Sequence, residues 1–201
     1  MQIKFIIGVN SNFVLSVIMI KNKADLIRFQ KIDAERFGYR KPTFLDGILK
    51  NENYYIWHYI RELRFVEYHK AVGNKIRYAW HFIKFKRLSW KLHYTIYPGT
   101  IGPGLMIYHV GGFIHVGSNV RIGKNCTLLP GVVFGKKTEI QESPKVCVGD
   151  NCYFGLDSKI FGPLNIGNNV TVGANSVVTK DIPDNAVVAG VPAKIIRIKN
   201  K

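Results

Sequence analysis

The sequence predicts a parallel β-helix in the second half of the chain and an α-helical region before it. From residue 116 onward an aliphatic or aromatic residue recurs at every sixth position, often followed by glycine, with one interruption. This spacing is the hexapeptide signature of a parallel β-helix, in which each hexad forms one flat face of a coil. We expect these residues to point inward and stack three hexads apart: Val116, Ile122, Leu128, Phe134, Val148, Phe154, Ile160, Ile166, Val172 and Val178.

A second set of positions supports this all-β solenoid. The residue four places after each repeat position is small or apolar, as required to fill a narrow tube. This second inward set consists of Val120, Cys126, Val132, Cys152, Ser158, Leu164, Val170 and Ser176.

The part before the repeat reads as helical. Apolar residues at helical spacing predict helices over residues 24–37, 53–72 and 74–93, with Gly38, Pro42 and Gly73 as stops and Asn74 as an N-cap. The first twenty residues are largely apolar but polar at 10–12, so we expect two short strands or a buried helix rather than a membrane span. We therefore divide the chain into a mainly α-helical, basic region (1–94) and a hexapeptide-repeat domain (95–201).

The chain is strongly basic, with 29 Lys and Arg against 13 Asp and Glu. Most of the excess lies in residues 1–95, with 18 basic against 7 acidic residues. Such a surface attracts phosphates, nucleic acid or anionic lipid, but the sequence contains no nucleic-acid-binding motif, and we expect no such partner. The cations and aromatic residues of 74–93 have two interpretations: aromatic packing with solvated cations, or peripheral contact with a membrane.

The three cysteines indicate neither a disulfide nor a metal site. Cys126 and Cys152 fall on inward positions, where they are expected to be small apolar fillers, and Cys147 should face outward. No His or further Cys stands at metal-ligand spacing, so we expect no metal. Free thiols fit a reducing, cytoplasmic compartment.

The repeat breaks twice, and functional groups are expected at the breaks. Ile101, Ile107 and Phe113 keep the six-residue spacing, but the next repeat position is Val116, so residues 108–115 bulge by three. The second break lies between Phe134 and Val148, fourteen residues where twelve would keep the phase, and predicts a polar loop over 135–145.

Residues 97–197 resemble the acyltransferase domain of the serine acetyltransferase family, whose members form left-handed parallel β-helices. The resemblance is carried by Tyr-Pro-Gly-Thr-Ile-Gly-Pro-Gly at 97–104, Tyr-His-Val-Gly-Gly at 108–112 and Ile-Gly-Lys-Asn-Cys-Thr at 122–127. Its most specific parts are Val-Gly-Ala-Asn-Ser-Val-Val-Thr-Lys-Asp-Ile-Pro at 172–183 and Ala-Gly-Val-Pro-Ala-Lys at 189–194. This similarity implies a left-handed β-helix that uses acetyl-CoA.

The resemblance implies general-base catalysis by His109. In this family the matching His takes the proton of an acceptor hydroxyl, which then attacks the thioester of acetyl-CoA; an imidazole is neutral yet basic at physiological pH and suits this role. Backbone N–H groups of Gly111 or Gly112 are candidates for the oxyanion site. His115 is the rival base.

The resemblance also places the donor and implies a homotrimer. The family binds the pantetheine arm along the coils between two subunits, and its Ala-Gly pair corresponds to Ala189 and Gly190. Lys194 and Arg197, helped by Lys180 or Lys136, are candidates for the phosphates of CoA.

The acceptor is less certain because several serine-binding positions differ. The family has an Asp two residues before its His-Pro and another directly before the catalytic His; this chain has Thr95 and Tyr108. A family His before Pro-Lys is replaced by Ser143, followed by Pro144 and Lys145, so Tyr108, Ser143 and Lys145 are the candidate acceptor contacts.

These departures lead to three functional hypotheses. We expect first an acetyl-CoA-dependent O-acetyltransferase acting on a surface-polysaccharide sugar or its precursor, as in the capsule and exopolysaccharide enzymes that this chain also resembles. The alternatives are serine O-acetylation for cysteine biosynthesis and an inactive trimeric scaffold. The enzyme is expected in the cytoplasm or peripherally on the inner membrane face.

Overall fold

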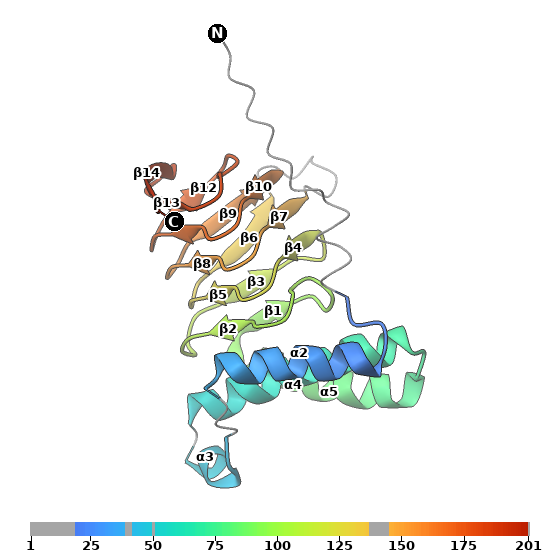
Figure 1. The fold of residues 1–201 in the computed structure, drawn as a ribbon. Helices are drawn as coiled ribbons and strands as arrows, with labels where there is room; N and C mark the ends of the chain where they lie inside the picture. The colour runs from blue at the N-terminus through green and yellow to red at the C-terminus, as the bar shows by residue number, and fades with distance from the viewer. Residues whose placement is uncertain (1–18, 39–41, 50, 137–144, 201) are drawn as a thin grey trace.

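The computed structural model describes residues 19–38, 42–49, 51–136 and 145–200. Within these ranges four helices precede a column of short strands that rises from them (Figure 1). The strands or helix predicted for the N-terminus lie outside the described residues, apart from Met19 and Ile20.

The three predicted helices are present, with ends shifted by one residue. They are α2 (Lys23–Arg36), α4 (Glu52–Ala71) and α5 (Lys75–Leu92). Asn74 caps α5 as predicted, because its side chain accepts a hydrogen bond from the Arg77 N–H at 3.1 Å. The short α3 (Phe44–Ile48) was not predicted; Thr43 and Asp46 form a capping box at its start.

The strands build a three-faced prism. The first face contains β1 (Tyr94–Ile96), β3 (Ile114–Val116), β6 (Val133–Lys136), β9 (Lys159–Gly162) and β12 (Val177–Val178). The second contains β4 (Val120–Ile122), β7 (Val146–Val148) and β10 (Leu164–Ile166). The third contains β2 (Met106–Ile107), β5 (Thr127–Leu128), β8 (Tyr153–Phe154), β11 (Thr171–Val172), β13 (Ala186–Ala189) and β14 (Lys194–Ile198). All neighbours pair in parallel except β13 and β14, and the chain visits the faces in turn.

The core follows the predicted repeat. Every residue of both inward sets is buried, and Val116, Phe134 and Ile160 lie in register on successive coils of the first face. The bulge after Ile107 is also present, but the prediction for Phe113 is wrong. Phe113 is exposed, and Ile114 is buried in its place.

The second break is larger than predicted. Phe134 lies on the first face and Val148 on the second, so the fourteen residues between them make one step around the prism, where six would suffice. The insertion therefore adds eight residues rather than two, because the sequence count assigned a second hexad that the single step between these two faces does not need. Residues 137–144 lie outside the described residues.

All three cysteines are buried and free of disulfides. Cys126 and Cys152 point into the tube as predicted, but the outward position of Cys147 is also covered, which corrects the expectation of an exposed thiol. Burial raises the pKa of the Cys147 thiol, because a thiolate is disfavoured away from water.

A buried ion cluster ties the helices to the first coil. Arg64 of α4 is fully buried; its Nε donates to Asp33 Oδ2 of α2 at 2.9 Å, and its Nη1 lies 3.3 Å from Glu67 Oε2. The same guanidinium donates to the carbonyl oxygens of Ile101 and Gly102 at 2.8 and 2.7 Å. The helical layer is thus fixed onto the end of the prism. No helix in the described ranges is both long and apolar enough to cross a bilayer.

Candidate functional site

His109 leaves the coil directly after β2. Its backbone has φ of 63°, a left-handed conformation uncommon for a residue with a side chain, and its carbonyl accepts a hydrogen bond from the Tyr94 hydroxyl at 2.8 Å. The imidazole itself is 68% exposed. The bulge therefore turns the backbone outward at His109 and leaves its imidazole accessible from solvent.

A carboxylate from the helical region holds this ring. Glu52, the first residue of α4, places Oε1 2.9 Å from His109 Nδ1, while its Oε2 accepts the Val110 N–H at 3.1 Å. A carboxylate is also favoured at a helix N-terminus by the helix dipole. Because Glu52 can only accept, Nδ1 carries the proton and the lone pair of Nε2 is available as a base.

The sequence reasoning missed Glu52. Thr95 and Tyr108 stand at the two positions where the family has an orienting Asp. Among the described residues, neither side chain forms a hydrogen bond with the His109 ring. Glu52 is 57 residues away along the chain. The available signal was only an acidic residue at the start of a predicted helix.

His115 lies in a different setting. It stands on β3, where its Nδ1 is 3.0 Å from Thr95 Oγ1 of the neighbouring β1 and its ring stacks on Phe113. Burial lowers the pKa of His115, since the charged ring is disfavoured away from water. A hydroxyl cannot stabilise an imidazolium as a carboxylate does, so the geometry favours His109 as the base.

A cavity of about 520 Å³ opens beside His109. The end of α2, the region around α3, the start of α4 and β2 all contribute, and Tyr108 is among the lining residues. Arg36 and Asp46 bring opposite charges to its wall. The cavity is lined by Arg36, Phe37, Gly38, Pro42, Asp46, Asn51, Glu52, Asn53, Met106, Ile107, Tyr108 and His109.

The glycines after His109 bring the bulge against the next coil. A Cβ on Gly112 would lie 2.6 Å from Pro130 Cβ and 2.7 Å from the Gly131 nitrogen, so no larger residue fits there. Gly111 has φ of 108°, which a side chain would strain. Both glycines therefore keep the loop close to the corner of the prism that carries His109.

The candidate donor residues lie along that same corner. Ile107 and Val188 occupy the same register position at opposite ends of the third face, and His109 and Gly190 each follow two residues later. Four strand steps separate β2 from β13, which is a distance of roughly 19 Å at ~4.8 Å per step. Ala189 ends β13 beside Gly190, and Lys194 and Arg197 lie on the exposed β14 paired with it.

The remaining predicted residues are not brought to this corner. Lys180 follows β12 and Lys145 precedes β7, so both lie where the chain passes from the first face to the second. Ser143 lies outside the described residues. Within one chain, Lys145 and Lys180 therefore do not join the His109 corner.

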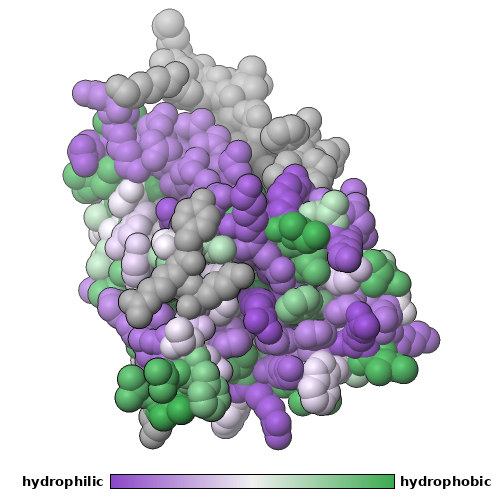
Figure 2. All heavy atoms as spheres, turned by 60° about the horizontal axis from the view of Figure 1, so that its bottom comes forward, coloured by the Kyte–Doolittle hydropathy of each residue, from purple (hydrophilic) through white to green (hydrophobic). Residues whose placement is uncertain are grey.

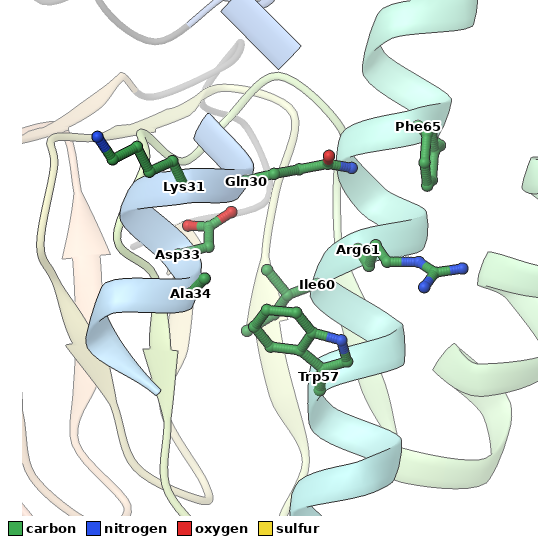
Figure 3. A pocket seen from close by; sticks show the side chains of 8 residues that line it. All are labelled: Gln30, Lys31, Asp33, Ala34, Trp57, Ile60, Arg61 and Phe65. Carbon is green, nitrogen blue, oxygen red and sulfur yellow. The ribbon is translucent and has the colours of Figure 1, made fainter. Parts of the chain in front are cut away.

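A second cavity, of about 550 Å³, lies between α2 and α4 (Figure 3). Trp57 projects from α4 towards α2 and Gln30 from α2 towards α4, but none of the predicted site residues lines this cavity. Among the described residues, no group of three or more His, Cys, Asp and Glu side chains is placed to hold a metal ion.

Comparisons with known proteins agree with the repeat. A family model described as the hexapeptide repeat of succinyl-transferase matches residues 114–141 and 145–180. A serine acetyltransferase of Mycobacterium tuberculosis is 36% identical over 102 residues, which are 50% of this chain and 44% of the relative. One from Staphylococcus epidermidis is 37% identical over 103 residues, 51% of this chain and 48% of the relative. The chain thus spans less than half the length of these relatives.

Solved structures extend the similarity over the helices. Neisseria gonorrhoeae serine acetyltransferase matches with a TM-score of 0.67 and 26% identity, over 89% of this chain and 69% of that one. The Brucella abortus enzyme in complex with coenzyme A matches with a TM-score of 0.70 and 25% identity, over 94% and 72%. The C-terminal half of this chain therefore folds as a left-handed parallel β-helix of hexapeptide repeats, and over this part it is similar to the serine acetyltransferases.

Proposed function

We propose that this protein transfers an acetyl group from acetyl-CoA to an acceptor hydroxyl, with His109 as general base and Glu52 as its positioning residue. The observation that carries the proposal is the 2.9 Å contact between Glu52 Oε1 and His109 Nδ1 at the mouth of the cavity. An exposed imidazole needs no carboxylate partner for folding, whereas a general base gains from one that fixes its tautomer.

The chain's own groups account for each proton. Nε2 of His109 takes the proton as the acceptor oxygen attacks the thioester carbonyl, and Glu52 stabilises the imidazolium that forms. Backbone N–H groups at Gly111 and Gly112 would stabilise the negative charge on the carbonyl oxygen. When the carbon–sulfur bond breaks, His109 returns the proton to the departing sulfur.

We propose that the donor lies along the corner that joins the third face to the first. Its thioester would lie near His109, and its pantetheine arm would run past the exposed backbone to Ala189 and Gly190. Lys194 and Arg197 on β14 offer cations for the phosphates. Support comes from the register of this corner and from the coenzyme A complex of the Brucella abortus relative.

We propose a homotrimer with the site between subunits. Lys145 lies at a different corner of the prism from His109, so its side chain would reach an active site only in a neighbouring copy. This arrangement would let Lys145 act as an acceptor contact across a subunit boundary. Because acetyl-CoA is a cytosolic metabolite, we place the reaction in the cytoplasm.

The comparisons favour L-serine as the acceptor, which the sequence reasoning ranked second. The relatives are named serine acetyltransferases, and Arg36 on the cavity wall has the charge to pair with the carboxylate group of an amino acid. A sugar hydroxyl remains the second candidate for a specific reason. The cavity of about 520 Å³ exceeds the volume of serine, and Phe37 and Tyr108 offer aromatic surfaces among polar groups.

The test is thiol release from acetyl-CoA by the full chain with L-serine, amino sugars and oligosaccharides. We expect one acceptor to stimulate release, and His109→Ala to reduce it ~100-fold or more while the protein stays folded. His115→Ala is the matched control and should retain most activity. No stimulation by any acceptor would favour the inactive scaffold, and full turnover by the His109 variant would refute the assigned base.

A further inference from the structure

Helix α5 carries apolar residues on two opposite faces. The inner face, formed by Tyr78, Phe82, Phe85 and Leu92, packs on the main core. The outer face is formed by residues placed two positions earlier, which is about 200° around a helix: Ile76, Trp80, Ile83 and Trp90. These four side chains are 85%, 60%, 55% and 85% exposed. A helix that only packed on its core would show a polar outer face.

The outer face is flanked by cations and by no anion. Helix α5 contains six Lys and Arg residues and neither Asp nor Glu. At 100° per residue, Lys75 and Lys86 lie along one side of the apolar stripe and Arg77, Lys84 and Lys91 along the other, with Arg87 within it. The Lys84 ammonium lies 4.7 Å from the centre of the Trp80 ring. Figure 2, in which the helical end of the molecule is turned forward, shows hydrophobic and hydrophilic side chains interspersed over that end.

Charge decides between two possible occupants of this face. In a two-fold contact between two copies of the chain, α5 would meet itself, and its cations would face those of the other copy without a carboxylate on the helix to pair them. In a three-fold contact, α5 would meet a different surface of a chain that has 29 Lys and Arg against 13 Asp and Glu, so anions to pair with its cations would be scarce. An anionic lipid surface offers the opposite charge. It also suits exposed Trp side chains beside Lys and Arg, because the rings enter the interface while the cations reach the headgroups.

We propose that the outer face of α5 docks this protein on an anionic lipid bilayer. The helix lies along the surface, with Ile76, Trp80, Ile83 and Trp90 entering the boundary between headgroups and acyl chains. Arg87 and the flanking cations contact the lipid phosphates. This docking is independent of the proposed acetyl transfer, since none of these residues lines the cavity beside His109.

The test is co-flotation of the full chain with vesicles of phosphatidylcholine, with and without phosphatidylglycerol. We expect the protein to float with the anionic vesicles only, and high salt to release it. The variant Ile83→Ser/Trp90→Ser should lower the bound fraction ~10-fold or more. Ile27→Ser is the matched control, because Ile27 on α2 is 57% exposed, as Ile83 is 55% exposed, but lies outside this face.

Circular dichroism and the melting temperature of each variant verify that it folds, which is expected because the replaced side chains face solvent. Equal binding to both kinds of vesicle, no binding by the wild type, or undiminished binding by the double variant would each overturn the proposal. So would a lower oligomer mass for the double variant in sedimentation, because that result would make the face a contact between copies.

Discussion

At the scale of single residues, the proposed function depends on one contact between two parts of the fold. His109 comes from the first bulge of the prism and Glu52 from the first turn of α4. Glu52 also accepts the Val110 N–H, so it fixes both the ring and the backbone of the loop. The carboxylate thus has the position of an orienting group, although it belongs to a helix outside the repeat.

We predict that Glu52→Gln lowers kcat ~10- to 100-fold with little change in the KM for acetyl-CoA. An amide can donate to Nδ1 and stabilise the wrong tautomer, and it cannot stabilise an imidazolium. Steady-state kinetics measure the change. The control is the double variant Glu52→Gln/His109→Ala, which should be no slower than His109→Ala alone, because Glu52 acts through the ring. An additive loss would show that Glu52 acts independently of His109.

The sequence indicated His109 but not its partner, for a physical reason. The His lies in a local motif with two glycines, so a short stretch of chain carries the signal. Glu52 comes close to His109 only when α4 docks on the first coil. This tertiary contact produces no repeat or motif that could be recognised in the sequence. The cavity residues Arg36 and Asp46 were missed for the same reason.

At the scale of elements, docking of α4 depends on Arg64. Its guanidinium is shielded from solvent. It donates hydrogen bonds to two carboxylates of the helical layer and to two carbonyl oxygens of the first coil. Asp33 in turn accepts the N–H groups of Gly104 and Leu105. The Tyr-Pro-Gly-Thr-Ile-Gly-Pro-Gly segment at 97–104 thus supplies the backbone groups that bind the helical layer.

Arg64→Ala should lower the free energy of unfolding by about 3–5 kcal/mol, because it leaves buried carboxylates without a cation. Arg61→Ala is the matched control, since Arg61 is an exposed cation on the same helix, and it should cost less than about 1 kcal/mol. Urea unfolding at a fixed protein concentration measures both. Similar small losses for the two variants would contradict a structural role for the cluster.

One buried and two partly buried histidines predict a pH dependence of stability. Burial is the main cause that lowers the pKa of His58, His69 and His115 in the folded chain. Below about pH 6.5 the unfolded chain therefore binds more protons than the folded one, so stability present at neutral pH is lost on acidification.

We expect the melting temperature to fall by several degrees between about pH 7 and about pH 5.5. His69→Phe should reduce this fall, because His69 stacks with Phe65 and His81 and a phenyl ring keeps the stacking without titrating. Differential scanning calorimetry across this range tests both. A melting temperature independent of pH, or an unchanged slope in the variant, would count against the assigned cause.

At the scale of the whole molecule, the repeat predicted the prism well because each hexad encodes one face by itself. Both inward sets are buried without exception. The errors occur at Phe113 and between Phe134 and Val148, where the repeat is interrupted. The spacing shows that the six-residue repeat is shifted there, but it does not show how many residues the insertion contains. Cys147 was misplaced for a related reason, since an outward position can still be covered.

The placement of Lys145 away from His109 predicts an oligomer. Sedimentation equilibrium of the full chain should give three times the chain mass of 22.8 kDa. The trimer should persist in His109→Ala, because that side chain is exposed and is not expected to carry the subunit contact. A monomer that retains full activity would refute a site shared between subunits.

The most direct test of the central claim is a crystal structure of the protein with coenzyme A. We predict that the sulfur lies within roughly 4 Å of His109 Nε2 and that the pantetheine arm follows the corner to Ala189 and Gly190. Glu52 should remain bonded to Nδ1. Coenzyme A bound elsewhere, or a His109 ring turned away from it, would contradict the account.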